Sequence, residues 1–145
     1  MKYASKLAVL LFGVGFLLMC HGAYCVSPLS LLKAALICLV PFILVTVLRR
    51  LINAPRPYEV YDFYTTPPKD KRGRSFPSRH VYSASVIATL TCFLYPVLGT
   101  VLCVLALTLA VLRVLLGIHF LRDVITGALV GVFAALLGIL ILLPF

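Results

Sequence analysis

The chain has 145 residues, of which 63% are hydrophobic and 12% are charged, with a net charge of +9 and a mean hydropathy of +1.14. A soluble domain of this size cannot bury so much apolar surface, so the composition excludes an ordinary soluble protein and predicts one membrane domain. The basic residues flank apolar runs, so we expect anionic lipid heads or a phosphorylated substrate as partners, and no nucleic acid.

The first apolar run covers about 7–26 and follows Lys2 and Lys6. This order is also typical of a signal peptide, but no convincing cleavage site follows, and we expect a retained first helix. Ser27-Pro28 predicts a turn before a second span at about 29–48, which contains Pro41. Membrane helices tolerate such a proline, although it favours a kink.

Residues 49–79 form the one long polar segment, rich in proline, tyrosine and basic residues. The prolines argue against a continuous helix, so we expect an interfacial loop with a short helical piece around Tyr58 to Tyr64. The next apolar run, Val81 to Leu112, has no charged residue and would reach about 48 Å as one helix, well beyond a bilayer core of about 30 Å. Pro96 and Gly99 therefore predict a break between spans at about 80–95 and 100–117.

A fifth span is expected at about 123–143, which completes an all-α, polytopic membrane helix bundle of about five transmembrane helices and one interfacial loop. Residues 1–145 then form a single domain. Since successive spans alternate in direction, Arg49, His80, Arg113, His119 and Asp123 should meet at one face of the membrane.

The five cysteines include no CxxC pair, and their odd number argues against a disulfide framework. We interpret them as small buried hydrophobic residues rather than metal ligands or redox groups.

His119 and Asp123 are four residues apart, so they share one face of a helix. A carboxylate in that position can accept a hydrogen bond from one ring nitrogen and leave the other free as a nucleophile or base. The alternative is that Asp123 caps the last helix and His119 is an interfacial side chain. Ionisable groups at the edge of a span favour a function.

With His80 as a second proton carrier, the polar residues indicate a phosphate site. One imidazole can attack phosphorus, the other can protonate the leaving oxygen, and several cations can hold the remaining oxygens. With only four carboxylates in the chain, we expect no metal and no cofactor. The candidate phosphate ligands are Arg49, Arg56, Ser78, Arg79 and Arg113.

Three short motifs, Arg49-x6-Arg56-Pro57, Pro77-Ser78-Arg79-His80 and Arg113-x5-His119-x3-Asp123, occur in this order. Together they resemble the signature of the type 2 phosphatidic acid phosphatase superfamily, which includes membrane lipid phosphatases and soluble vanadium haloperoxidases. The resemblance covers residues 49–123, about half of the chain.

The resemblance implies that His119 is the nucleophile that forms a phosphohistidine, that Asp123 orients it, and that His80 is the general acid. It also implies that Arg49, Arg56, Ser78 and Arg113 bind phosphate, and that Pro57 and Pro77 shape the loops.

The chain departs from the family pattern in four respects. Arg49 replaces the usual Lys, Leu112 stands where Ser often precedes the Arg, and one of the usual six spans is missing. Arg79 replaces the usual Gly, and its side chain either adds a phosphate ligand or blocks the pocket.

The sequence leaves two possibilities for the side of the membrane that carries the active site. All lysines and arginines except Lys33 fall on the active-site side, and the positive-inside rule would make that side cytoplasmic. The resemblance implies that the active site lies on the extracytoplasmic face, and this is the face we expect. We expect the protein in the plasma membrane of a bacterium.

We therefore expect a metal-independent, integral membrane phosphatase that hydrolyses a lipid phosphate or a polyprenyl diphosphate such as undecaprenyl diphosphate. One alternative is a non-hydrolytic protein of the same fold that binds or moves phospholipid heads. Another is a scaffold bundle whose polar residues only mark the ends of its spans. A homodimer is plausible for so short a bundle.

Overall fold

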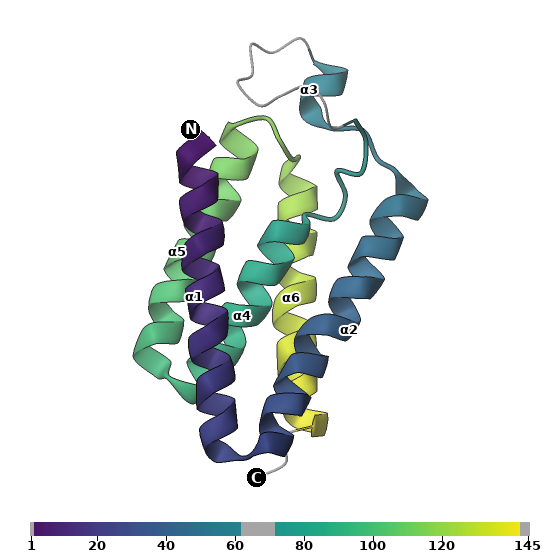
Figure 1. Ribbon diagram of the computed structural model, residues 1–145. Coiled ribbons are helices and arrows are strands. Elements are labelled where there is room, and N and C mark those ends of the chain that lie inside the picture. Colours follow the sequence, from purple (N-terminus) through teal and green to yellow (C-terminus); the bar gives the residue numbers. More distant parts are fainter. Residues whose placement is uncertain (1, 62–71, 143–145) are drawn as a thin grey trace.

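The computed structural model describes residues 2–61 and 72–142, and in this part the chain folds into six helices without a strand. They are α1 (Lys2–Val26), α2 (Pro28–Ile52), α3 (Pro57–Val60), α4 (Arg79–Leu94), α5 (Pro96–Leu115) and α6 (Leu121–Leu142). The five long helices form one bundle, with the short α3 beyond the end of α2 (Figure 1). The expected all-α bundle is confirmed.

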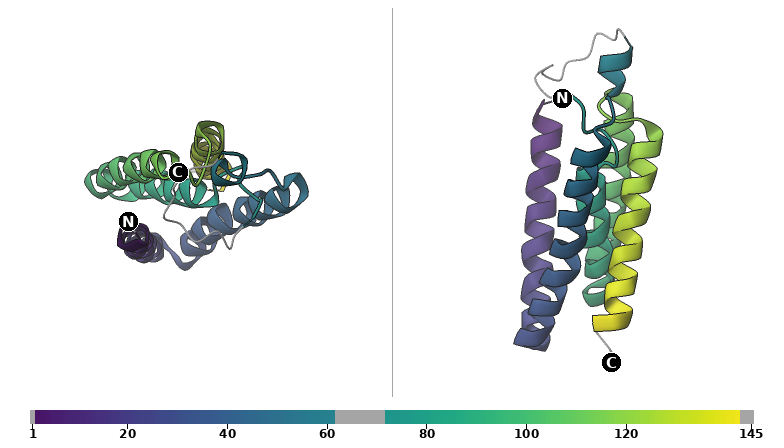
Figure 2. Two further views of the ribbon diagram at one scale, coloured as in Figure 1. Left: turned by 90° about the horizontal axis from the view of Figure 1, so that it is seen from above. Right: turned by 90° about the vertical axis from the view of Figure 1, so that its right-hand side faces the viewer.

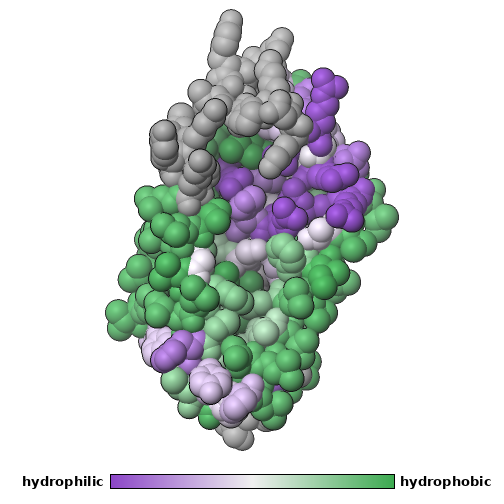
Figure 3. Space-filling model, in the orientation of Figure 1, coloured by the Kyte–Doolittle hydropathy of each residue, from purple (hydrophilic) through white to green (hydrophobic). Residues whose placement is uncertain are grey.

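Four of the described helices, α1, α2, α5 and α6, are long and apolar enough to cross a membrane. Their large side chains point outward, as lipid-facing residues do: Leu17 and Leu107 are each 67% exposed and Leu140 is 77% exposed. The chain is thus an integral, multi-pass membrane protein. Figure 3 shows hydrophobic surface over most of the bundle and a hydrophilic cluster toward the end near α3.

The remaining bundle helix, α4, has 16 residues and is about 24 Å long at 1.5 Å per residue. It packs against α1, α2, α5 and α6, and the view from above in Figure 2 shows it among them. Two glycines of α6 permit this close packing. A Cβ on Gly127 would lie 2.6 Å from the carbonyl oxygen of Ser78, and one on Gly131 would lie 2.6 Å from that of Tyr82.

Helix boundaries differ from the expected spans by a few residues, for local reasons. The fourth span begins at Pro96 rather than near Thr100, because proline fits the first position of a helix. The second span continues through Pro41 to Ile52 and ends where Asn53 adopts a left-handed conformation with φ 43°. The expected helical piece near Tyr58 is α3, which is shorter than predicted because Tyr61 is already extended. Residues 62–64 lie outside the described residues.

The directions of the helices bring the polar motifs together at one end of the bundle. The C-terminal ends of α2 and α5 and the N-terminal ends of α4 and α6 all lie at the same end of the bundle as the N-terminus (Figure 1). The expected convergence at one face is therefore present in the fold.

Candidate active site

The segment before α4 is fastened to the end of α2 by the buried guanidinium of Arg49. Its Nη1 donates to the carbonyl oxygen of Pro77, its Nη2 donates to that of Arg74, and Nη1 also lies 3.5 Å from that of Ser75. The backbone N–H of Ser75 donates to the carbonyl oxygen of Ala54 at 2.9 Å. Arg49, expected as a phosphate ligand, thus holds the backbone of the loop.

Two further hydrogen bonds hold the backbone of Gly73 in place. Its N–H donates to Glu59 Oε1 at 2.6 Å, and its carbonyl oxygen accepts from Arg56 Nε at 3.0 Å. Gly73 has φ 63°, and a Cβ there would lie 2.5 Å from Asn53 Oδ1. Only glycine suits this position, both in conformation and in space.

This loop brings Ser75 to His119 and Asp123, where all three side chains are buried. Ser75 Oγ donates to Asp123 Oδ2 and lies 3.2 Å from His119 Nδ1, and His119 Nδ1 lies 3.5 Å from the same carboxylate oxygen. Asp123 Oδ2 also accepts from the backbone N–H of Phe120 at 3.1 Å. Because Nδ1 faces these acceptors, it carries the ring proton, and Nε2 keeps a free lone pair.

His119 is only 2% exposed. Burial lowers the pKa of His119 below its usual value, and the positive charges of Arg56, Arg113 and Arg49 lower it further, while the contact with Asp123 opposes the shift. The ring is therefore neutral at pH 7, as a nitrogen nucleophile must be.

Two hydrogen-bond donors beside this cluster, the Ser78 hydroxyl and the Arg113 guanidinium, have no acceptor among the described residues. Ser78 Oγ is fully buried without a hydrogen bond. Arg113 is 9% exposed, and among the described residues no acceptor pairs with its guanidinium. Both are tied to the cluster through the backbone, since Ser78 N–H donates to the carbonyl oxygen of Asp123 at 2.8 Å and His119 N–H to that of Arg113 at 3.2 Å. Buried, unpaired donors are costly unless a ligand accepts from them.

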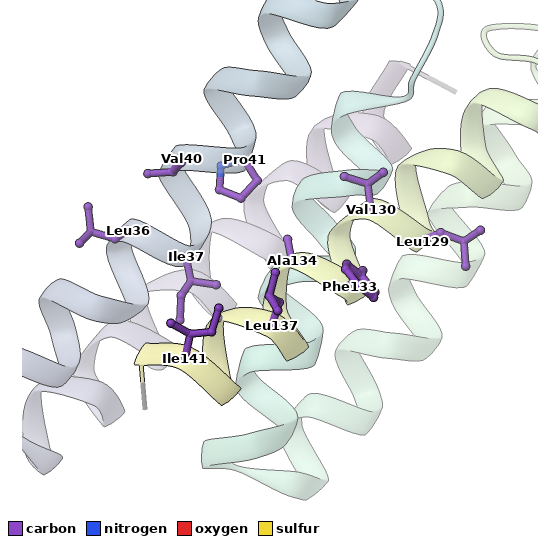
Figure 4. A pocket seen from close by; sticks show the side chains of 11 residues that line it. Leu36, Ile37, Val40, Pro41, Leu129, Val130, Phe133, Ala134, Leu137 and Ile141 are labelled. Atoms are coloured by element: carbon purple, nitrogen blue, oxygen red, sulfur yellow. The ribbon is translucent and has the colours of Figure 1, made fainter. Parts of the chain in front are cut away.

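A cavity of about 430 Å³ runs from this end of the bundle between α1, α2, α4 and α5. Its polar wall contains Arg79, His80 and Arg113, and its apolar wall includes Phe12, Phe16, Phe42, Ile87 and Leu109. A larger cavity of about 750 Å³ lies between α2 and α6 (Figure 4). It is lined only by apolar residues, whereas the smaller cavity carries the charged side chains.

The predicted site residues fall into four groups. His119 and Asp123 lie side by side, and Ser78 is buried next to them with its hydroxyl unpaired. Arg79, His80 and Arg113 line the cavity, and Arg49 and Arg56 bind loop carbonyls. Ser75 and Glu59 were missed. Ser75 lies in the polar segment 49–79, but its residue type does not separate it from Ser78. In the described part of the chain, no three His, Cys, Asp or Glu side chains gather as metal ligands would.

Comparison with known proteins assigns the chain to a family. The family model of the PAP2 superfamily matches residues 30–144. The chain belongs to the PAP2 superfamily. This confirms the resemblance carried by the three sequence motifs and supports the expectation of a membrane lipid phosphatase.

Two solved structures share the fold of this PAP2 protein. One is a transmembrane PAP2-type phosphatidylglycerolphosphate phosphatase from Bacillus subtilis, with a TM-score of 0.68 and 23% identity over 95% of this chain and 76% of that one. The other is LpxE from Aquifex aeolicus, with a TM-score of 0.66 and 24% identity over 92% of this chain and 93% of that one. A search of curated protein sequences gave no significant match.

Proposed function

We propose that this PAP2 protein hydrolyses a phosphate ester or diphosphate of a membrane lipid through a phosphohistidine at His119. The observation that carries the proposal is a buried, neutral histidine beside the unpaired hydroxyl of Ser78 and the buried guanidinium of Arg113, for which the described residues supply no acceptor. A phosphoryl group that accepts from both donors presents its phosphorus to Nε2.

In the proposed reaction, His119 Nε2 forms a bond to phosphorus while the bond from phosphorus to the leaving oxygen breaks. His80 gives its proton to that oxygen. Water then attacks the phosphohistidine, His80 takes a proton from the water, and inorganic phosphate leaves with His119 regenerated. Asp123 and Ser75 keep the ring proton on Nδ1 throughout, so Nε2 is the atom that reacts.

The phosphate oxygens would be held by Arg113, Ser78 and the first turn of α4, which has no side-chain cap. Unpaired N–H groups at a helix start bind anions, and donors fixed before the reaction stabilise developing charge without reorganising. Arg49 and Arg56 contribute by holding the loop and by their positive charge. The two arginines on the same cavity wall disfavour the protonated form of His80, and the negative charge of a bound phosphate offsets their effect.

The cavity supports a lipid as the substrate. Its volume of about 430 Å³ lies within the range of roughly 300–1,000 Å³ found for small-molecule sites. Cations stand at one end and aromatic and aliphatic side chains continue from them, which suits a charged head followed by a hydrocarbon chain.

We also propose that the site faces away from the cytoplasm of a bacterial plasma membrane. The last helix, α6, ends at the end of the bundle opposite the site (Figure 1). A C-terminal fluorescent protein that folds only in the cytoplasm should therefore be bright. A dark fusion, together with an active secreted-phosphatase fusion at the same place, would reverse the orientation.

The function is tested by phosphate release from the purified protein in detergent with EDTA. The substrates are phosphatidic acid, phosphatidylglycerophosphate and undecaprenyl diphosphate, and His119→Ala is compared with His21→Ala. His21 is exposed at the other end of the bundle and serves as the matched control. Release that survives EDTA and His21→Ala but not His119→Ala supports the proposal, and a folded parent without release on any lipid contradicts it.

A further inference from the structure

Arg79 is a half-buried cation without a counter-ion. It is the first residue of α4, and its guanidinium carbon lies 5.5 Å from the ring centroid of Phe42 on α2. In the described part of the chain the ion pairs are those of Asp123 with His119 and Arg122, and Arg79 makes none. The contact with the ring holds the guanidinium in place but supplies no acceptor for its N–H donors.

Arg79 differs in this from Arg49 and Arg56. Arg49 and Arg56 donate to backbone carbonyl oxygens, so much of their hydrogen-bonding capacity is used within the protein. Arg79 on α4 and Arg113 on α5 instead line the same cavity, together with His80. The cavity wall therefore carries two guanidinium groups, neither of which is paired with an acceptor among the described residues.

The position of Arg79 along the cavity indicates which part of a substrate it meets. Ser75, His119 and Asp123 lie outside the cavity lining, whereas Arg79 lines it together with Phe12, Phe16 and Phe42. A lipid whose terminal phosphate reaches His119 and whose chain lies among these rings therefore also meets the cavity wall that holds Arg79.

We propose that Arg79 forms a second anion subsite, which binds a second phosphate group located between the scissile phosphate and the hydrocarbon chain. The inference rests on the proposed phosphatase function and narrows it to lipids with two phosphate groups. Two chemical sources carry such a group: a polyprenyl diphosphate, and a glycerophospholipid whose head bears a terminal phosphate beyond its phosphodiester. A planar guanidinium binds either one through two parallel hydrogen bonds.

The test uses two pairs of substrates that share a tail and differ in the second phosphate. These are undecaprenyl diphosphate against undecaprenyl phosphate, and phosphatidylglycerophosphate against phosphatidic acid. Inorganic phosphate release gives kcat/KM for the parent and for Arg79→Gln, Arg79→Lys, Phe42→Leu and Arg50→Gln. Phe42→Leu removes the ring contact but keeps the guanidinium, and Arg50→Gln removes an exposed charge of α2 that does not line the cavity.

The parent should prefer the two-phosphate member of at least one pair, and the pair in which it does identifies the source of the second phosphate. Arg79→Gln should lower kcat/KM for that member about tenfold more than for its one-phosphate partner, since a hydrogen bond between charged groups is lost. Arg79→Lys should recover only part of the preference. Phe42→Leu and Arg50→Gln should leave the preference in place.

If Arg79→Gln and Phe42→Leu lower turnover of both members equally, Arg79 merely joins α4 to α2 and the subsite does not exist. If the parent has the same kcat/KM for the one-phosphate and the two-phosphate lipid in both pairs, the subsite is overturned and the proposed phosphatase function still stands. A folded parent that hydrolyses none of the four lipids overturns both.

Discussion

The hydroxyl of Ser75 links His119 to Asp123, with Oγ 3.2 Å from His119 Nδ1 and a hydrogen bond from Oγ to Asp123 Oδ2. The ring and the carboxylate approach each other only to 3.5 Å, which is beyond good hydrogen-bond geometry. Ser75 therefore completes the orientation of the ring, and it comes from a loop distant in sequence. We regard it as a positioning residue.

Replacing Ser75 by alanine should lower kcat about 10- to 100-fold, because the ring loses a partner that fixes the reacting nitrogen. KM should change little, since Ser75 lies outside the cavity lining. Ser75→Thr, which keeps the hydroxyl, should recover part of kcat. Steady-state kinetics with Ser30→Ala as control checks this, and an unchanged kcat would show that Asp123 orients His119 alone.

The low pKa of His119 sets the acid side of the activity profile. A histidine with an ordinary pKa of about 6.5 is half protonated at that pH, but burial and neighbouring arginines keep His119 neutral further into acid. The acid limb of kcat/KM due to His119 should thus lie below pH 6.5 and move upward in Arg56→Gln. An acid limb that stays in place in this variant would contradict the role of Arg56.

The same shift predicts a change in stability with pH. The unfolded chain binds a proton on His119 near pH 6.5, while the folded protein resists protonation until lower pH. The contribution is present above pH 6.5 and is lost as the pH falls through the lowered pKa. Thermal unfolding in detergent should show this loss in the parent and a smaller one in His119→Gln.

The close approach of α6 to the start of α4 predicts a steric effect at Gly127. A Cβ on Gly127 would lie 2.6 Å from the carbonyl oxygen of Ser78, a backbone atom that cannot turn away. Gly127→Ala should destabilise the protein by about 1–3 kcal/mol and reduce activity by displacing Ser78. Gly13→Ala, where a Cβ would meet nothing within 4 Å, is the matched control for the thermal unfolding experiment.

Adjacent arginines on α2 should behave in opposite ways. Arg49 is 9% exposed and binds three carbonyl oxygens of the loop, whereas Arg50 is exposed. Arg49→Gln should misplace Ser75 and lower kcat about 100-fold, while Arg50→Gln should have little effect. Arg49→Lys should restore little, because an ammonium lacks the planar fork. Equal effects of both glutamine variants on phosphate release would refute this role.

The bundle and the meeting of the motifs were predictable because both follow from the apolar runs. Each run is long enough to specify a helix, and alternating direction then places Arg113, His119 and the start of α4 at one end. The break at Pro96 was predictable for the same kind of reason, since proline begins a helix more easily than it continues one.

The different contacts that the polar residues make were not predictable from the apolar runs. Arg49 and Arg79 are the same residue type at the ends of neighbouring helices, yet one faces loop carbonyls and the other a cavity. Ser75 and Ser78 are three residues apart, yet one bridges His119 and Asp123 while the other has no partner. These differences depend on the path of the loop, which is set by contacts such as that of Glu59 with Gly73.

The central claim is that His119 carries the phosphoryl group. The direct measurement is rapid mixing of the protein with a lipid labelled in its terminal phosphate, followed by alkaline quenching, which preserves phosphohistidine, and peptide mapping. We predict label on His119 of the parent, with neither label nor phosphate release in His119→Ala. Label on another residue, or release by His119→Ala at a rate close to that of the parent, would contradict the account.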